Sequence, residues 1–154
     1  MKVILQTVNS ASVRINDKLV ASIARGYLLL VGFGDGDNEA TCDLMVDKIL
    51  KLRCFADENR NINLDIETIK GEILSVSQFT LYANTSKGRR PSFIDALNPS
   101  EASRLYDYFN EELAIRYNHH IETGIFGADM KVESINDGPF TLILDSDNLW
   151  KKEY

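Results

Sequence analysis

The sequence feature that most constrains the fold is a continuous apolar run, Tyr27-Leu28-Leu29-Leu30-Val31-Gly32-Phe33, which follows Gly26. It has the length of a strand and no polar position, a pattern typical of a strand that is covered on both faces. We therefore expect residues 27–33 to form a central strand. The rest of the chain must supply both its neighbours in a sheet and the elements that cover it.

Alternating polar and apolar residues predict the neighbouring strands. Residues 12–23 predict a hairpin, because two alternating segments flank the turn Asn16-Asp17-Lys18. Asn136-Asp137-Gly138-Pro139 predicts a second tight turn, which joins two further alternating segments. We expect residues 62–64 to re-enter the main sheet. The other expected strands are at residues 2–8, 72–82, 130–135 and 140–145.

Two segments carry the signals of helices. Either Asp37 or Asn38 caps a helix that runs to about Phe55, and its apolar residues recur at helical spacing. Asn98 caps a second helix, Pro99 suits its first position, and the apolar stripe ends near Tyr117. Together the elements predict an α+β domain, a curved, mostly antiparallel β-sheet or barrel with two main helices packed on it.

The composition is that of a soluble globular protein, with 44% apolar and 26% charged residues in a chain of 154. We expect one domain over residues 1–150 and a loose C-terminal tail at 151–154. No apolar run approaches the roughly 20 residues of a membrane span, so we expect no membrane contact. The first residues lack a signal-peptide layout, and Cys42 and Cys54 lack metal-site spacing. A cytoplasmic protein with reduced thiols is therefore expected.

The charge of the chain limits the kinds of partner that it can bind. A formal net charge of −6 argues against a general nucleic-acid coat protein but not against contact with one end of a nucleic acid. Lys87, Arg89 and Arg90 form a basic cluster in a loop, which is either a solvated surface or a set of phosphate contacts. His119 and His120 are adjacent loop residues that point to opposite sides, so we expect neither a metal site nor a cofactor.

Ser77, Gln78 and Thr80 are unusual in the predicted strand 72–82, where a structural strand would carry apolar side chains. A buried polar group is costly unless it finds a hydrogen-bond partner. One interpretation is that the hydroxyls bond to neighbouring backbone at the end of a strand. The other is that these residues line a functional site.

Four motifs stand out along the chain: Ser77-Gln78-Phe79-Thr80-Leu81, Gly88-Arg89-Arg90-Pro91-Ser92-Phe93, Thr123-Gly124-Ile125-Phe126-Gly127-Ala128-Asp129-Met130 and Asn136-Asp137-Gly138-Pro139-Phe140-Thr141. They resemble those of the D-aminoacyl-tRNA deacylase family, the D-tyrosyl-tRNA deacylases, which proofread chirality in translation. The match runs nearly end to end, and the motifs occur in the family's order. The one visible departure is Phe140, where a smaller β-branched residue is expected.

The resemblance implies an activity and an assembly. The implied activity is hydrolysis of the ester bond of D-aminoacyl-tRNA, and we expect some cleavage of glycyl-tRNA, since glycine has no side chain to reject. The implied assembly is a homodimer with its active sites at the subunit interface. It also implies that Gly138 and Pro139 are joined by a cis peptide bond and reach into the partner's site, where rigid main chain excludes L-aminoacyl groups.

The polar strand suggests how such an ester would be cleaved. We expect backbone N–H groups around Gln78, Phe79 and Thr80 to form an oxyanion hole, with the substrate's 2′-hydroxyl helping to activate water. Ser77 and Thr80 would then orient and shape the site. A Ser77 or Thr80 nucleophile is the alternative, but it needs a base within hydrogen-bond reach.

The remaining predicted site residues concern the RNA. Lys87, Arg89 and Arg90 are candidates for phosphate contacts, with modest salt dependence. Met130 is a candidate for lining the pocket of the terminal adenosine, or else a core residue. Two other functions remain open: a Ser/Thr esterase acting on small esters, and a non-catalytic dimer that binds aminoacyl-tRNA.

Overall fold

The computed structural model describes residues 1–150, and the predicted tail, 151–154, lies outside the described residues. Within residues 1–150 the strands are β1 (Lys2–Ile15), β2 (Lys18–Ile23), β3 (Gly26–Gly32), β4 (Arg53–Ala56), β5 (Ile62–Asp65), β6 (Glu72–Ser77), β7 (Ile121–Thr123) and β8 (Lys131–Asp145). The helices are α1 (Glu39–Lys51), α2 (Pro99–Arg116) and the short α3 (Ser146–Leu149), with a 3-10 helix η1 (Phe79–Tyr82). None of these helices is long and apolar enough to span a membrane.

The main sheet is organised around β1. Its order is β2-β1-β3-β6-β7, and β8 also pairs with β1. The strand β1 is antiparallel to β2, β3 and β8, whereas the β3–β6 and β6–β7 pairs are parallel. One strand serves three partners because its first half pairs with β3 and its second half with β2, while β8 follows both halves. The predicted class is confirmed: α+β, with a curved, mostly antiparallel sheet.

The apolar run forms the central strand β3, as predicted. Successive side chains of a strand point to opposite faces. Tyr27, Leu29 and Val31 belong to the larger core beneath the helices, and Leu28 belongs to a second core on the other face. Both faces of β3 are therefore covered, and each fully buried aliphatic side chain contributes about 1.5–3 kcal/mol.

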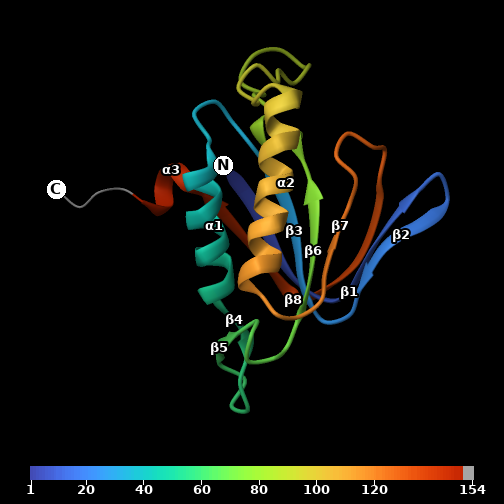
Figure 1. The fold of residues 1–154 in the computed structure, drawn as a ribbon, viewed down its shortest axis with the longest axis vertical. Helices are drawn as coiled ribbons and strands as arrows, with labels where there is room; N and C mark the ends of the chain where they lie inside the picture. The colour runs from blue at the N-terminus through green and yellow to red at the C-terminus, as the bar shows by residue number, and fades with distance from the viewer. Residues whose placement is uncertain (151–154) are drawn as a thin grey trace.

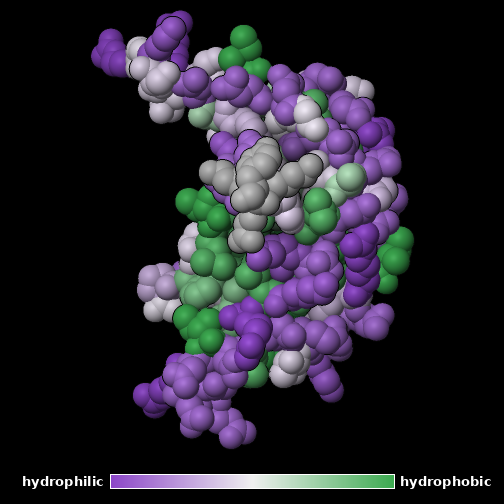
Figure 2. All heavy atoms as spheres, turned by 90° about the vertical axis from the view of Figure 1, so that its left-hand side faces the viewer, coloured by the Kyte–Doolittle hydropathy of each residue, from purple (hydrophilic) through white to green (hydrophobic). Residues whose placement is uncertain are grey.

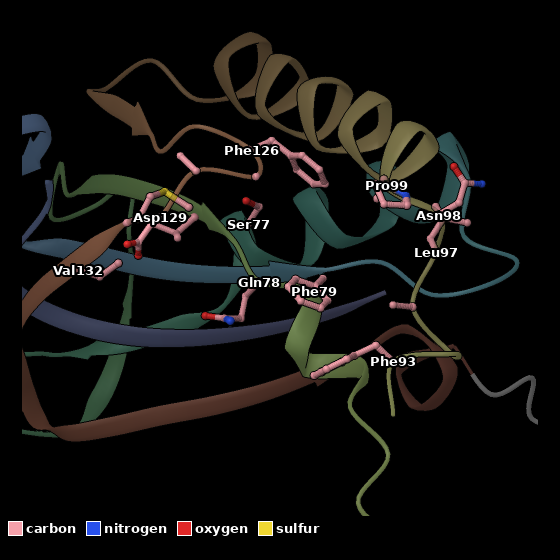
Figure 3. Close-up of a pocket in the computed structure, with 16 residues that line it drawn as sticks. Ser77, Gln78, Phe79, Phe93, Leu97, Asn98, Pro99, Phe126, Asp129 and Val132 are labelled. Atoms are coloured by element: carbon pink, nitrogen blue, oxygen red, sulfur yellow. The ribbon is translucent and has the colours of Figure 1, made fainter. Parts of the chain in front are cut away.

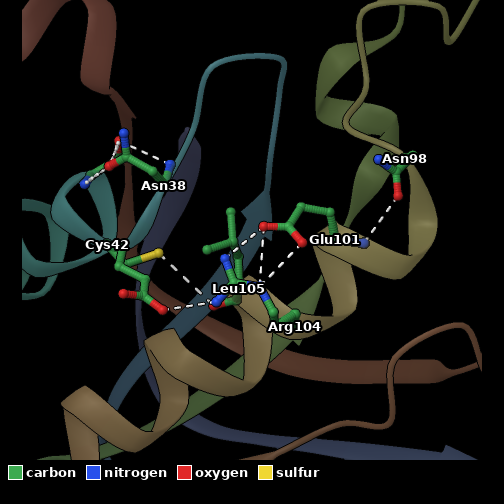
Figure 4. Close-up of polar contacts among 8 residues, drawn as sticks. Asn38, Cys42, Asn98, Glu101, Arg104 and Leu105 are labelled. Atoms are coloured by element: carbon green, nitrogen blue, oxygen red, sulfur yellow. Dashed lines mark hydrogen bonds and ion pairs between the residues drawn. The ribbon is translucent and has the colours of Figure 1, made fainter.

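The two main helices lie side by side over one face of the sheet (Figure 1). Both begin at an asparagine: Asn38, one of the two predicted candidates, accepts from the backbone N–H of Thr41, and Asn98 accepts from the N–H of Glu101, as predicted. Arg104 on α2 joins the two starts by ion pairs to Glu101 and to Glu39 of α1 (Figure 4). The helices thus begin at the same end of the molecule.

Three predicted boundaries are wrong. The segment at 2–8 and that at 12–15 belong to one strand, β1, because β8 pairs along nearly its whole length. The first helix ends at Lys51 rather than near Phe55, since Leu52 is already extended and residues 53–56 form β4. Residues 62–64 lie in β5, which pairs with β4 in a separate two-stranded sheet and does not re-enter the main one.

Candidate active site

The polar strand ends earlier than predicted, at Ser77, and the chain then turns into η1. The last ladder bond runs from the Gln78 N–H to the Val31 carbonyl at 2.7 Å. The turn is possible because β3 ends in a glycine: a Cβ on Gly32 would lie 2.9 Å from the Gln78 carbonyl oxygen and 3.1 Å from Cβ of Leu81. The missing side chain lets the backbone of η1 approach β3.

This turn forms one wall of a cavity of about 600 Å³ (Figure 3). The opposite walls come from the start of α2 and from the loop at 124–130, with the loop before α2 at one end. In Figure 3 the Ser77 side chain and the Phe126 ring point into the same space beneath α2. The volume lies within the roughly 300–1,000 Å³ of sites that hold one small ligand.

Four of the predicted site residues line this cavity: Ser77, Gln78, Phe79 and Met130. Thr80 does not line it, but its hydroxyl accepts a hydrogen bond from the Gln78 side chain. Met130 also packs against the second core, because Gly124 leaves room for its sulfur: a Cβ there would lie 2.5 Å away. Met130 therefore lines the cavity and packs against a core at the same time.

Phe93, Phe126 and Asp129 also line the cavity, although no role was predicted for them. Phe93 ends the second motif of the resemblance, and Phe126 and Asp129 belong to the third. The motifs themselves were thus the signal, but neither charge nor periodicity distinguishes these positions from an ordinary loop.

A backbone junction ties the loop at 124–130 to the strand. The carbonyl of Ser75 accepts from the Gly124 N–H at 2.9 Å and from the Tyr106 hydroxyl at 2.8 Å. Burial raises the pKa of Tyr106, so its hydroxyl keeps the proton that it donates. The Phe126 ring in turn lies 6.0 Å from that of Tyr106. The cavity wall is therefore fixed to both α2 and β6.

The two histidines lie outside helices and strands, as predicted, and far from Ser77. His119 contacts Glu67 at 3.0 Å and His120 contacts Glu122 at 3.3 Å. The His120 carbonyl accepts from the N–H of Ile73, four residues before Ser77 on β6, which is about 13 Å along a strand. Within residues 1–150 no group of three or more His, Cys, Asp or Glu side chains is placed to hold a metal ion.

The basic cluster lies in an exposed loop that is closed at its base. Asn84 and Ser92 exchange two backbone hydrogen bonds, of 2.7 and 2.9 Å, and so pin both ends of the loop. Lys87, Arg89 and Arg90 lie between them, exposed, and do not line the cavity. The loop leads directly to Phe93 at the end of the cavity.

The Gly138-Pro139 dipeptide of the fourth motif lies within β8. The prediction of a tight turn that joins two strands here is therefore wrong. Both halves of β8 pair with β1, and the segment from Asn136 to Phe140 bulges out between them, since Gln6 faces Thr141 whereas Val8 faces Asn136. A hairpin would need β8 to fold back on itself. The long partner β1 instead keeps the chain running in one direction.

Side chains hold the bulge in place. Asn136 donates to the carbonyls of Thr7 and Phe140 at 3.1 and 2.9 Å and accepts from the Phe140 N–H at 3.0 Å. The Thr7 hydroxyl donates to the Asp137 carbonyl at 2.8 Å. The Gly138–Pro139 peptide bond is cis, both residues are exposed, and neither lines the cavity of its own chain. The structure therefore brings Ser77 and Met130 together but leaves Gly138–Pro139 outside.

Comparison with known proteins adds the relatives of this chain. The family model described as D-Tyr-tRNA(Tyr) deacylase matches residues 4–145. The chain belongs to this family. Two relatives, both called D-aminoacyl-tRNA deacylase, are those of Lactobacillus helveticus, 52% identical over 94% of this chain and 99% of the relative, and of Thermosipho melanesiensis, 49% identical over 95% and 97%.

Solved structures also match this chain. One, titled c-Myc DNA Unwinding Element Binding Protein, has a TM-score of 0.89 and 38% identity and covers 94% of this chain and 98% of its own. Another, titled as a probable eukaryotic D-amino acid tRNA deacylase, has a TM-score of 0.81 and covers 93% of this chain and 97% of its own. Its sequence identity is 22%, so this likeness shows the fold alone. Fold and family thus agree.

Proposed function

We propose that this chain hydrolyses the ester bond of D-aminoacyl-tRNA, releasing free tRNA and the D-amino acid, and that it also cleaves glycyl-tRNA. The observation that carries the proposal is the turn at Ser77–Phe79, whose residues line a cavity sized for one ligand in a chain of the deacylase family. Its relatives at about half identity are called D-aminoacyl-tRNA deacylases.

The cavity supplies the contacts that the end of an aminoacylated RNA needs. Phe126 and Met130 offer an apolar wall for the terminal adenine, and the exposed Lys87, Arg89 and Arg90 offer charge to the phosphates. Three basic residues make few phosphate contacts, so binding falls only modestly with salt and discriminates little among tRNAs. The net charge of −6 does not favour duplex DNA as the partner.

The oxyanion of the reaction is stabilised by main chain. The Gln78 N–H is already used by the Val31 carbonyl. The N–H groups of Phe79 and Thr80 are the first two of η1, and the first N–H groups of a helix have no acceptor within it. In this proposal the N–H of Phe79, which lines the cavity, and the N–H of the next residue, Thr80, form the oxyanion hole for the developing negative charge.

Water is the nucleophile in this scheme, and the neighbouring 2′-hydroxyl of the ribose assists it. A Ser77 or Thr80 nucleophile would need a base, and the histidines lie at the other end of β6. The Thr80 hydroxyl instead accepts from the Gln78 side chain, which fits an orienting role. Ser77 shapes the floor of the cavity.

Discrimination between D and L forms requires a second copy of the chain. We propose a homodimer in which Gly138–Pro139 of one copy reaches the cavity of the other, and their main chain occupies the space that an L side chain would need. The exposure of this dipeptide supports the assembly, as do exposed apolar side chains on β8: Val132 at 38%, Ile135 at 58% and Ile143 at 75%. Hydrophobic residues gather along one flank of the face in Figure 2, beside a mostly hydrophilic surface.

The direct test is deacylation of D-tyrosyl-tRNA and L-tyrosyl-tRNA by the purified protein. We expect cleavage of the D ester, little cleavage of the L ester, and measurable cleavage of glycyl-tRNA. An intact D ester after incubation would leave only a binding function. Equal cleavage of D-tyrosine ethyl ester without RNA would instead favour a Ser/Thr esterase that acts on small esters.

A further inference from the structure

A pair of exposed aromatic rings marks the end of the cavity beside the basic loop. Phe79 and Phe93 pack edge to face, with ring centroids 5.0 Å apart and an angle of 62° between the planes. Their exposed fractions are 56% and 37%, so neither ring serves the core. Phe79 comes from η1 and Phe93 from the loop before α2, so the ring pair joins two separate segments. Exposed aromatic side chains at the rim of a cavity point to a ligand.

The cavity has two distinct ends. In Figure 3 Phe79 and Phe93 lie at the end opposite Asp129 and Val132. The volume of about 600 Å³ suits one aminoacyl nucleoside rather than two nucleotides. If the terminal adenosine occupies the Phe126 and Met130 wall, the preceding nucleotide lies outside the cavity.

The positive charge of the loop beside the rings indicates which part of a ligand lies at this end of the cavity. Arg90 precedes Phe93 by three residues, at most about 11 Å along the chain, and Lys87 and Arg89 share its loop. The hydrogen bonds between Asn84 and Ser92 hold the base of that loop next to Phe93. A flat apolar surface beside cations is the combination with which proteins bind single-stranded nucleic acid, bases on the rings and phosphates on the cations.

We propose that Phe79 and Phe93 form a stacking platform for the base of the penultimate nucleotide of the RNA 3′ end. The two rings lie at the rim of the cavity, at one end of it, and the platform rests on the proposed function only for the identity of the RNA. It adds affinity for the acceptor end of any tRNA, because every base has a π face and the platform offers no hydrogen-bond code.

The test compares two RNA trinucleotides that carry no ester, CCA and the same molecule with an abasic middle position. We expect the wild-type protein to bind CCA about tenfold more tightly than the abasic probe, the size of one stacked base. In Phe93→Leu, which keeps apolar volume but loses the aromatic face, this ratio falls below about twofold. Phe93→Tyr restores it. The ratio within one variant cancels any general loss of folded protein.

Ile94→Ala is the matched control, since Ile94 is 80% exposed in the same loop and does not line the cavity. We expect Ile94→Ala to keep the tenfold ratio between the affinities for CCA and for the abasic probe. Equal affinity of the wild type for the two probes would overturn the platform, as would an equal loss in Ile94→Ala. A halved molecular mass of Phe93→Leu in light scattering would also overturn it, because the rings would then belong to a subunit interface. Because no ester is involved, the ratio is measured whether or not the protein deacylates D-tyrosyl-tRNA.

Discussion

The end of β6 and the bulge of β8 both interrupt a strand, yet they face different surroundings. At the end of β6, Ser77 and Gln78 are half-buried and line a cavity within one chain. In the bulge, Gly138 and Pro139 are exposed and meet no cavity of their own chain. Both are held by hydrogen bonds to a neighbouring strand, Gln78 to β3 through its backbone and Asn136 to β1 through its side chain.

The contrast shows that a single chain forms the turn after β6 and its cavity, whereas the bulge of β8 lies outside that cavity. The turn after β6 is held within one chain, by the Gln78 hydrogen bond to β3 and by the close approach that the missing side chain at Gly32 allows. The bulge is equally well supported from within, yet its outer surface has no partner among residues 1–150. Four predictions test whether that surface completes the cavity of a second copy.

The largest effect is expected from Gly138→Ala. Gly138 has φ of +141°, and an added Cβ would lie 2.8 Å from the Phe140 nitrogen, so the dipeptide must move. We expect deacylation of D-tyrosyl-tRNA to fall at least about 100-fold, because a displacement of about 1 Å has that cost.

Mixed dimers sharpen this prediction. Copies with Gly138→Ala, combined with copies damaged in the cavity by Gly32→Ala, form some dimers with one intact site. Random pairing then restores roughly a quarter of wild-type activity. No restoration in a demonstrated mixed dimer would show that each copy uses its own bulge.

Gly32→Ala alone should have the next largest effect. The new Cβ would lie 2.9 Å from the Gln78 carbonyl oxygen, so the turn that carries the oxyanion donors shifts by a few tenths of an ångström. We expect kcat to fall about 30-fold, with a smaller change in KM. The measurement is single-turnover deacylation with a thermal melt beside it. A large change in KM at unchanged kcat would place the donors elsewhere.

Asn136→Ala should loosen the bulge without touching the cavity. It removes three hydrogen bonds and leaves backbone groups of Thr7 and Phe140 without partners. We expect unfolding free energy to fall by about 2 kcal/mol and activity by about tenfold. Asp137→Ala is the control, because Asp137 contributes its carbonyl rather than its side chain to the bulge, and it should stay within about 0.5 kcal/mol. Urea unfolding measures both variants.

The smallest effects are expected from Ser77→Ala and Thr80→Ala. If the donors are backbone N–H groups, each variant loses one neutral hydrogen bond at most, and the chemical step slows less than about fivefold. Removal of a true nucleophile in a serine hydrolase costs about 10⁶-fold in kcat. Single-turnover rates separate the two cases, and a loss of several orders of magnitude would replace the water mechanism with a side-chain nucleophile.

Local sequence signals predicted the elements whose reasons are local. The hairpin at 12–23 forms, and Asn16 and Asp17 take the positive φ values of 49° and 63° that its turn needs. The helix over 99–116 begins at Asn98 and Pro99 because cap residues act within one turn. Ser77 and Gln78 line the cavity, which is one of the two interpretations that their polarity allowed, and Phe79 lines it as a member of the same motif.

Other features could not be predicted, because they depend on a distant partner. An alternating segment indicates which faces are buried but not how long its neighbour is. The strand β8 therefore continues in the same direction past the bulge at Asn136–Phe140, because β1 pairs with it on both sides of the bulge. For the same reason β6 stops at Ser77, where β3 ends, although apolar residues continue to Tyr82.

The sequence by itself determined the central strand, the cap of the second helix, the family and the unusual polar residues at the end of β6. Only the tertiary structure decided that Ser77 and Met130 share a cavity with Phe93 and Phe126, and that Gly138–Pro139 lies outside it. The physical reason is range. Propensity, capping and side-chain alternation act over a few neighbouring residues, whereas a cavity is the space left when elements far apart in the chain pack together.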